Sequence, residues 1–104
     1  MDKVIRDGKV AVLYSPGYGA GWYSWHDIKE LIYDPIVVDM VERKEFANVI
    51  ESYCEEKYGD DAYFGGAEDL QVEWIPIGTK FRIAEYDGAE SIEYYDETKW
   101  EIAE

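Results

Sequence analysis

Apolar and polar positions alternate near the start of the chain, as is typical of β-strands. The runs Lys3 to Arg6 and Lys9 to Tyr14 are both rich in β-prone residues, and Asp7-Gly8 separates them. Asp-Gly is favoured in two-residue type I′ turns, because both central residues of such a turn take a positive φ. We therefore expect an N-terminal β-hairpin.

The spacing of apolar residues then changes to one that favours helices. Ser24 is placed to cap a helix over Trp25 to Tyr33. Asp34-Pro35 predicts the start of a second helix, since proline loses no hydrogen bond at the first helical position. The β-branched pair Val37-Val38 leaves a strand possible there.

The clearest helical pattern lies between Glu45 and Tyr58. Its apolar residues recur at i, i+3, i+4, i+7 and i+8, and Gly59 is placed to end the helix in the left-handed conformation. The stripe consists of Phe46, Val49, Ile50, Tyr53 and Cys54. We expect Cys54 to be a small core residue and not a nucleophile.

Alternation returns in the last third of the chain. Asp69 to Ile75 is typical of a strand, and Lys80 to Tyr86 and Ala89 to Tyr95 flank a second Asp-Gly pair at 87–88. The alternating run Lys99 to Ile102 could add an edge strand. We predict a single α+β domain over residues 1–104, with an N-terminal β-hairpin, two or three helices and a C-terminal antiparallel sheet.

Charge narrows the possible partners. The chain carries 24 acidic and 10 basic side chains, a net charge of −14. Residues 45–104 hold 17 of the acidic and 4 of the basic ones. This excess argues against nucleic acid or an anionic membrane as a direct partner, because a binder of phosphates needs a cationic surface. It favours a partner protein with a basic surface, although acidity can also serve solubility alone.

A carboxylate array on the second hairpin could imitate a nucleic-acid backbone. In a strand, residues such as Glu85 and Asp87 point the same way about 6.6 to 6.8 Å apart, and Glu93 could lie opposite one of them. Phosphates along a DNA strand have a similar order of spacing. We assign the following acidic residues to the partner-binding surface: Glu85, Asp87, Glu90, Glu93, Asp96, Glu97, Asp60, Asp61, Glu68 and Asp69.

A glycine-rich loop offers an alternative, a small-ligand site. Gly17, Gly19 and Gly21 lie between a predicted strand and a predicted helix, where phosphate-binding nests occur. The third glycine has the wrong spacing for a dinucleotide fingerprint, and Trp22 stands where that fingerprint has glycine. The glycines could equally let a tight loop pass beneath aromatic rings. The candidate ligand-binding residues are Gly17, Tyr18, Gly19, Gly21, Trp22 and Trp25.

The residue inventory argues against an enzyme, a metal site or a cofactor. The chain has one histidine, His26, and one cysteine, and neighbouring helical residues such as Ser24, His26 and Asp27 do not converge into a triad. We expect His26 to be exposed. A zinc site needs four ligands, of which one histidine and one cysteine supply only two. The spacing of acidic residues in a calcium-binding EF-hand is absent. No apolar run is long enough for a membrane span, and the N-terminus lacks the apolar stretch of a secretory signal.

The glycine-rich segment also carries a resemblance. Residues 12–22, Val-Leu-Tyr-Ser-Pro-Gly-Tyr-Gly-Ala-Gly-Trp, together with Asp34-Pro35 and Glu85-Tyr86-Asp87-Gly88, resemble small proteins encoded by tailed bacteriophages, over most of the chain. The resemblance implies a location, the cytoplasm of an infected bacterium, and no specific activity or site. Because small acidic phage proteins there are often inhibitors, it also implies inhibition of a host nuclease or other defence protein. A nucleotide-binding protein and a small virion or assembly component are the alternatives.

Overall fold

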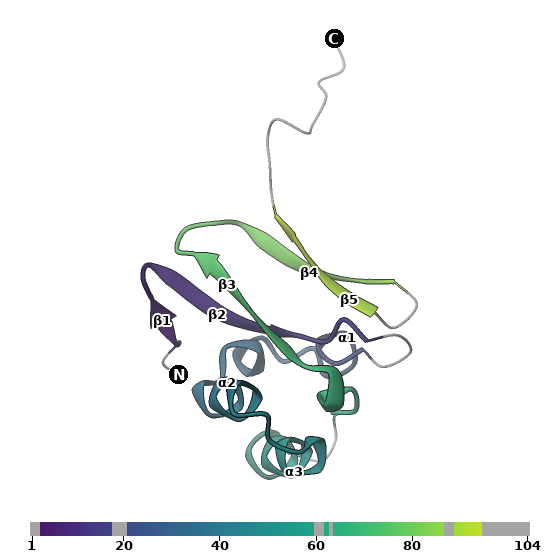
Figure 1. Ribbon diagram of the computed structural model, residues 1–104. Coiled ribbons are helices and arrows are strands. Elements are labelled where there is room, and N and C mark those ends of the chain that lie inside the picture. Colours follow the sequence, from purple (N-terminus) through teal and green to yellow (C-terminus); the bar gives the residue numbers. More distant parts are fainter. Residues whose placement is uncertain (1–2, 18–20, 60–61, 63, 87–88, 95–104) are drawn as a thin grey trace.

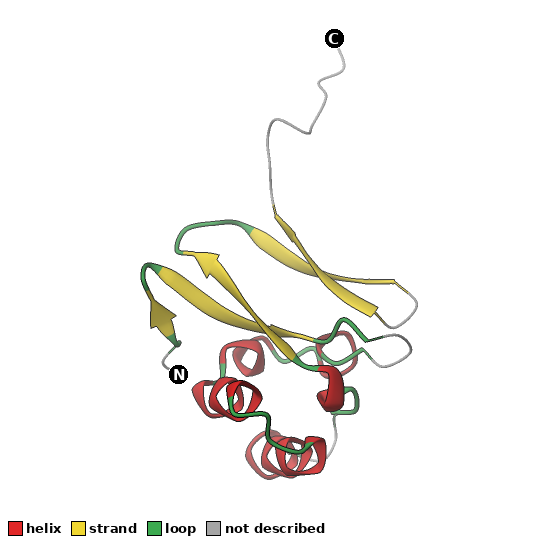
Figure 2. Cartoon of the chain, in the orientation of Figure 1, coloured by secondary structure: helices red, strands yellow, loops and turns green. Residues whose placement is uncertain are grey.

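Strands form one layer of the molecule and helices pack against one face of it (Figures 1 and 2). The computed structural model describes residues 3–17, 21–59, 62, 64–86 and 89–94. The architecture is α+β, as predicted from the sequence.

The β-layer contains two antiparallel units. Strand β1 (Ile5–Arg6) pairs with β2 (Lys9–Tyr14), and β2 pairs with β3 (Gln71–Pro76). Strands β4 (Phe81–Tyr86) and β5 (Ala89–Tyr94) form a separate two-stranded ladder. The turn between β1 and β2 has positive φ at Asp7 (51°) and Gly8 (74°), which confirms the predicted hairpin. The second Asp-Gly turn and the expected strand at 99–102 lie outside the described residues.

The predicted helix over Trp25 to Tyr33 is wrong. The chain instead forms a short helix α1 (Tyr23–His26), a left-handed residue at Asp27 (φ 57°) and a 3-10 helix η1 (Lys29–Tyr33). The break has a local cause, because the Nδ1 atom of His26 accepts a hydrogen bond from the Ile28 N–H at 2.9 Å. A bond that spans two residues closes a turn and competes with the helical pattern.

The two longer helices follow the predicted starts more closely. Asp34 caps helix α2 (Pro35–Glu42) by accepting from the Ile36 N–H, so the pair Val37-Val38 is helical. Helix α3 (Ala47–Tyr58) ends at Gly59 with a positive φ of 92°, but ψ is 162° and the residue is therefore not left-handed helical as expected. A last short 3-10 turn is η2 (Ala67–Asp69).

The core lies between the β2–β3 face and the helices. It is built by Ala11, Val12, Leu13, Trp22, Leu31, Ile32, Val37, Val38, Met40, Ile50, Cys54, Phe64, Ala67, Leu70 and Ile75. Cys54 is fully buried and burial raises the pKa of its thiol to about 12, which confirms its role as a core residue. The α3 stripe is only partly buried, since Phe46 (76% exposed) and Val49 (38%) face solvent. Among the described residues no helix is long and apolar enough to span a membrane.

Candidate functional site

Glu90 is buried and does not lie on the predicted partner-binding surface. Only 2% of the residue is exposed. Its carboxylate accepts hydrogen bonds from the N–H groups of Ser15 (2.8 Å), Trp22 (2.9 Å) and Ser24 (2.8 Å), and from the Ser24 hydroxyl (3.0 Å). The assignment of Glu90 to an exposed array is therefore corrected: its charge is used inside the fold.

The carboxylate of Glu90 joins both ends of the glycine-rich segment to β5. Ser15 precedes that segment, Trp22 and Ser24 follow it, and the Glu90 N–H donates in turn to the Ser15 carbonyl at 2.8 Å. Converging backbone N–H groups of this kind form an anion-binding concavity. The sequence offered a phosphate-binding nest at the glycines as an alternative, whereas in the structure the N–H groups of the flanking residues Ser15, Trp22 and Ser24 bind the chain's own carboxylate.

Those of the other candidate ligand-binding residues that the structure describes are not arranged as a phosphate site. Trp22 is fully buried, and the Asp69 side chain lies so close to Gly17 that a Cβ atom would overlap it. Gly21 takes φ +67° against the Trp25 ring, which explains a glycine there without a ligand. Trp25 is 60% exposed, while Tyr18 and Gly19 lie outside the described residues.

The surface beside the glycine segment is also acidic. A shallow cavity of about 300 Å³ is lined by Pro16, Gly17, Glu68, Asp69, Leu70 and Gln71. Carboxylates at Glu68 and Asp69 would repel a phosphate group there. The described residues on this side of the glycine-rich segment therefore disfavour a phosphate group next to Glu68 and Asp69.

The remaining predicted acidic residues have separate positions. Glu85 and Glu93 are exposed on the β4–β5 ladder, but Glu93 lies opposite Arg82 and pairs with it at 2.7 Å, not opposite Glu85 or Asp87. Glu68 and Asp69 are exposed on η2. Asp60, Asp61, Asp87, Asp96 and Glu97 lie outside the described residues.

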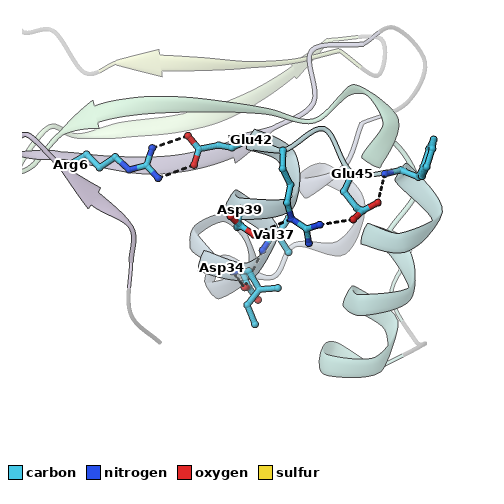
Figure 3. A network of polar contacts seen from close by, with 9 residues as sticks. Arg6, Asp34, Val37, Asp39, Glu42 and Glu45 are labelled. Atoms are coloured by element: carbon cyan, nitrogen blue, oxygen red, sulfur yellow. Dashed lines mark hydrogen bonds and ion pairs between the residues drawn. The ribbon is translucent and has the colours of Figure 1, made fainter.

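Other acidic side chains are neutralised by cations of the same chain. Glu42 accepts two hydrogen bonds from Arg6, at 2.9 and 3.0 Å, and Asp39 and Glu45 both pair with Arg43 (Figure 3). Asp34 is fully buried and pairs with Lys57 at 3.2 Å. The buried Asp34 carboxylate stabilises the fold, whereas the exposed pairs of Glu42, Asp39 and Glu45 are weak and mainly reduce the net charge of those acids.

Two elements that contact each other, α3 and η2, carry carboxylates without such pairing, while other described carboxylates without an ion pair, such as Glu30 on η1, lie elsewhere. Glu51 and Glu55 are four residues apart and so share one face of α3, on the flank away from Tyr53 and Lys57. Among the described residues, no ion pair joins these two or the η2 acids to a cation. We call Glu51, Glu55, Glu68 and Asp69 the α3–η2 acidic surface. Sequence reasoning found its η2 half and missed its α3 half, although the spacing of Glu51 and Glu55 was a usable signal.

His26 is buried, which corrects the expectation that it is exposed. Its ring lies edge-on to Trp22 at 4.6 Å between centroids, and near Phe64 at 5.7 Å. Burial lowers the pKa of His26 to about 4, against a smaller raising effect of Asp27. Because Nδ1 accepts the Ile28 N–H, the neutral ring carries its proton on Nε2, which is buried without a hydrogen-bond partner among the described residues.

We expect the free energy of unfolding to fall as the pH drops from about 6.5 to about 4, by up to roughly 3 kcal/mol from His26. In that range His26 is protonated in the unfolded chain and neutral in the folded chain, so a lower pH favours unfolding. Urea titrations at several pH values measure the effect. His26→Asn, which keeps an acceptor for the Ile28 N–H, should flatten this slope. An unchanged slope in His26→Asn would contradict the assignment.

The described residues contain no group of three or more histidine, cysteine or acidic side chains placed to hold a metal ion. Comparisons with protein-family models, curated proteins and solved structures found no match to the chain.

Proposed function

We propose that this protein is a non-enzymatic acidic binding protein that covers the basic, nucleic-acid-binding surface of another protein and so blocks it. The observation that carries the proposal is the α3–η2 acidic surface, whose four carboxylates have no cationic partner among the described residues. Carboxylates that are not paired with cations of the same chain can bind a cationic groove of another protein.

The array sits on a fixed support. Tyr53, Lys57 and Tyr58 of α3 bind the buried carboxylate of Asp34, which anchors the helix to the start of α2. A fixed helix backbone reduces the conformational entropy that is lost on binding. Each exposed ion pair contributes only about 0 to 1 kcal/mol, so the carboxylates must act together, mainly by speeding association.

An apolar side chain at the N-terminal end of α3 can supply contact that slows the dissociation of a partner. Phe46, the N-cap residue of α3, is 76% exposed, whereas Val49 (38% exposed) shares the helix face of Tyr53 and Lys57, away from Glu51 and Glu55. Aromatic anchors beside charged groups are typical of protein interfaces. The resemblance to bacteriophage proteins supports a setting for this binding, the cytoplasm of an infected bacterium, with a host nuclease or other defence protein as the partner.

Displacement of DNA tests the proposal. Purified bacterial nucleases and DNA-binding proteins are each loaded with fluorescein-labelled duplex DNA, and anisotropy is followed as this protein is added. We expect release of the DNA from at least one of them, with an affinity that weakens as salt is raised, because surface charges are screened.

Charge reversal locates the contact. Glu55→Lys and Glu68→Lys should each weaken displacement by about three- to tenfold at low salt. Glu30→Lys, on the exposed surface of η1, makes the same charge change elsewhere and should have little effect. Displacement of no partner, or equal losses in all three variants, would contradict the proposal.

A further inference from the structure

A cleft of about 420 Å³ lies between the α1–η1 segment and β4, away from the α3–η2 acidic surface. It is lined by Tyr23, Lys29, Ile32, Tyr33, Phe81, Arg82 and Ile83. A volume of this size falls in the range of small-molecule sites. The lining contains no acidic side chain, in a chain whose net charge is −14.

The lining combines flat apolar walls with positive charge. Tyr23, Tyr33 and Phe81 offer aromatic surface and are each half-buried, while Lys29 and Arg82 are exposed cations. Lys3, which is not part of the lining, places its Nζ atom 4.2 Å from the centre of the Tyr33 ring. Aromatic walls suit a planar ring, and the cations suit a negatively charged group on that ring.

Arg82 keeps donors for a second anion although it pairs with Glu93. Glu93 Oε2 accepts from Nε at 2.8 Å and lies 2.7 Å from Nη2. A guanidinium has five N–H donors, so those on Nη1 remain for a ligand. Both side chains of the pair are well exposed, and such a pair is weak enough for a doubly charged phosphate to compete with it.

We propose that this cleft binds a small aromatic phosphate of the nucleoside monophosphate class. The base lies against Tyr33 and Phe81, and the phosphate contacts Lys29 and Arg82. A nucleic-acid strand is not the ligand, because the acidic remainder of the molecule repels a polyanion. The proposal does not depend on the function assigned to the α3–η2 acidic surface.

Isothermal titration calorimetry of the full chain with AMP, adenosine and inorganic phosphate tests the proposal. We expect AMP to bind with a Kd of about 0.1 to 1 mM, and adenosine and phosphate to bind at least tenfold more weakly, because each lacks one half of the recognised chemistry. Absence of saturation by AMP up to about 5 mM would overturn the proposal.

Variants place the binding in the cleft. Lys29→Gln and Arg82→Gln should each weaken AMP binding about three- to tenfold and leave weak adenosine binding unchanged. Lys9→Gln, an exposed cation on β2, changes the net charge equally and should leave the AMP affinity within twofold. If Lys9→Gln has the same effect as the cleft variants, or the cleft variants have none, the site assignment is wrong.

Discussion

Glu90→Ala will lower the free energy of unfolding by about 3 to 5 kcal/mol, the largest effect expected from any exchange of an acidic residue in this chain. The change removes the acceptor of three backbone N–H groups and one hydroxyl. The Ser15 and Trp22 donors are in a buried region, so water cannot replace the carboxylate there without a rearrangement. Urea unfolding followed by tryptophan fluorescence measures the loss.

Two further variants serve as controls for Glu90→Ala. Glu93→Ala removes an exposed carboxylate from the same strand and should change stability by less than about 1 kcal/mol. Glu90→Gln keeps the shape but turns an amide group toward N–H donors, so we expect a loss between those of the other two variants. Similar stabilities of Glu90→Ala and Glu93→Ala would show that Glu90 does not close the glycine-rich segment.

Asp34→Ala will lower the free energy of unfolding by about 3 to 4 kcal/mol. The fully buried carboxylate accepts from the hydroxyls of Tyr58 (2.6 Å) and Tyr53 (2.8 Å), from Lys57 Nζ (3.2 Å) and from the Ile36 N–H (2.9 Å). Its removal takes the cap from α2 and leaves the two α3 tyrosines and Lys57 without their shared acceptor. Chemical denaturation of Asp34→Ala beside Asp39→Ala measures the difference, since Asp39 forms only an exposed pair with Arg43.

The buried carboxyl group of Asp34 should also make the free energy of unfolding depend on pH under acidic conditions. Burial alone raises the pKa of its carboxyl, but the hydrogen bonds from Tyr58, Tyr53, Ile36 and Lys57 outweigh burial and lower it below the ordinary value of 3.8. The stabilisation is therefore complete above pH 3.8 and is lost as the pH falls through the lower folded value. Stability curves of the native chain and Asp34→Asn should converge in that range. Parallel curves would contradict the assigned charge state.

Sequence reasoning succeeded where neighbouring residues determine the structure. Asp7 and Gly8 both take the positive φ that the central residues of a type I′ turn require. Asp34 caps helix α2, and Pro35 suits its first turn. Sequence reasoning failed over Trp25 to Tyr33. There Ser24 bonds to Glu90, which is 66 residues away in the chain, and His26 bonds to Ile28 instead of continuing the helix.

In the candidate site, too, the features set by neighbouring residues could be predicted and those set by distant contacts could not. The excess of acid in the second half of the chain was evident, but alternation along β5 does not reveal that Glu90 points into the molecule or that Glu93 lies opposite Arg82. Both facts depend on strand register and on what packs against the ladder. The glycine pattern suggested a nest only as an alternative, and it did not reveal that the N–H groups of Ser15, Trp22 and Ser24 bind a carboxylate from a distant strand.

We propose that the α3–η2 acidic surface makes the contact with a basic partner. Amide chemical-shift mapping tests it most directly, with the isotope-labelled chain titrated by a protein that lost its DNA in the displacement assay. We expect the largest shifts at Glu51, Glu55, Glu68 and Asp69 and at the start of α3. Shifts concentrated on the β4–β5 ladder, or spread evenly over the molecule, would contradict the proposal.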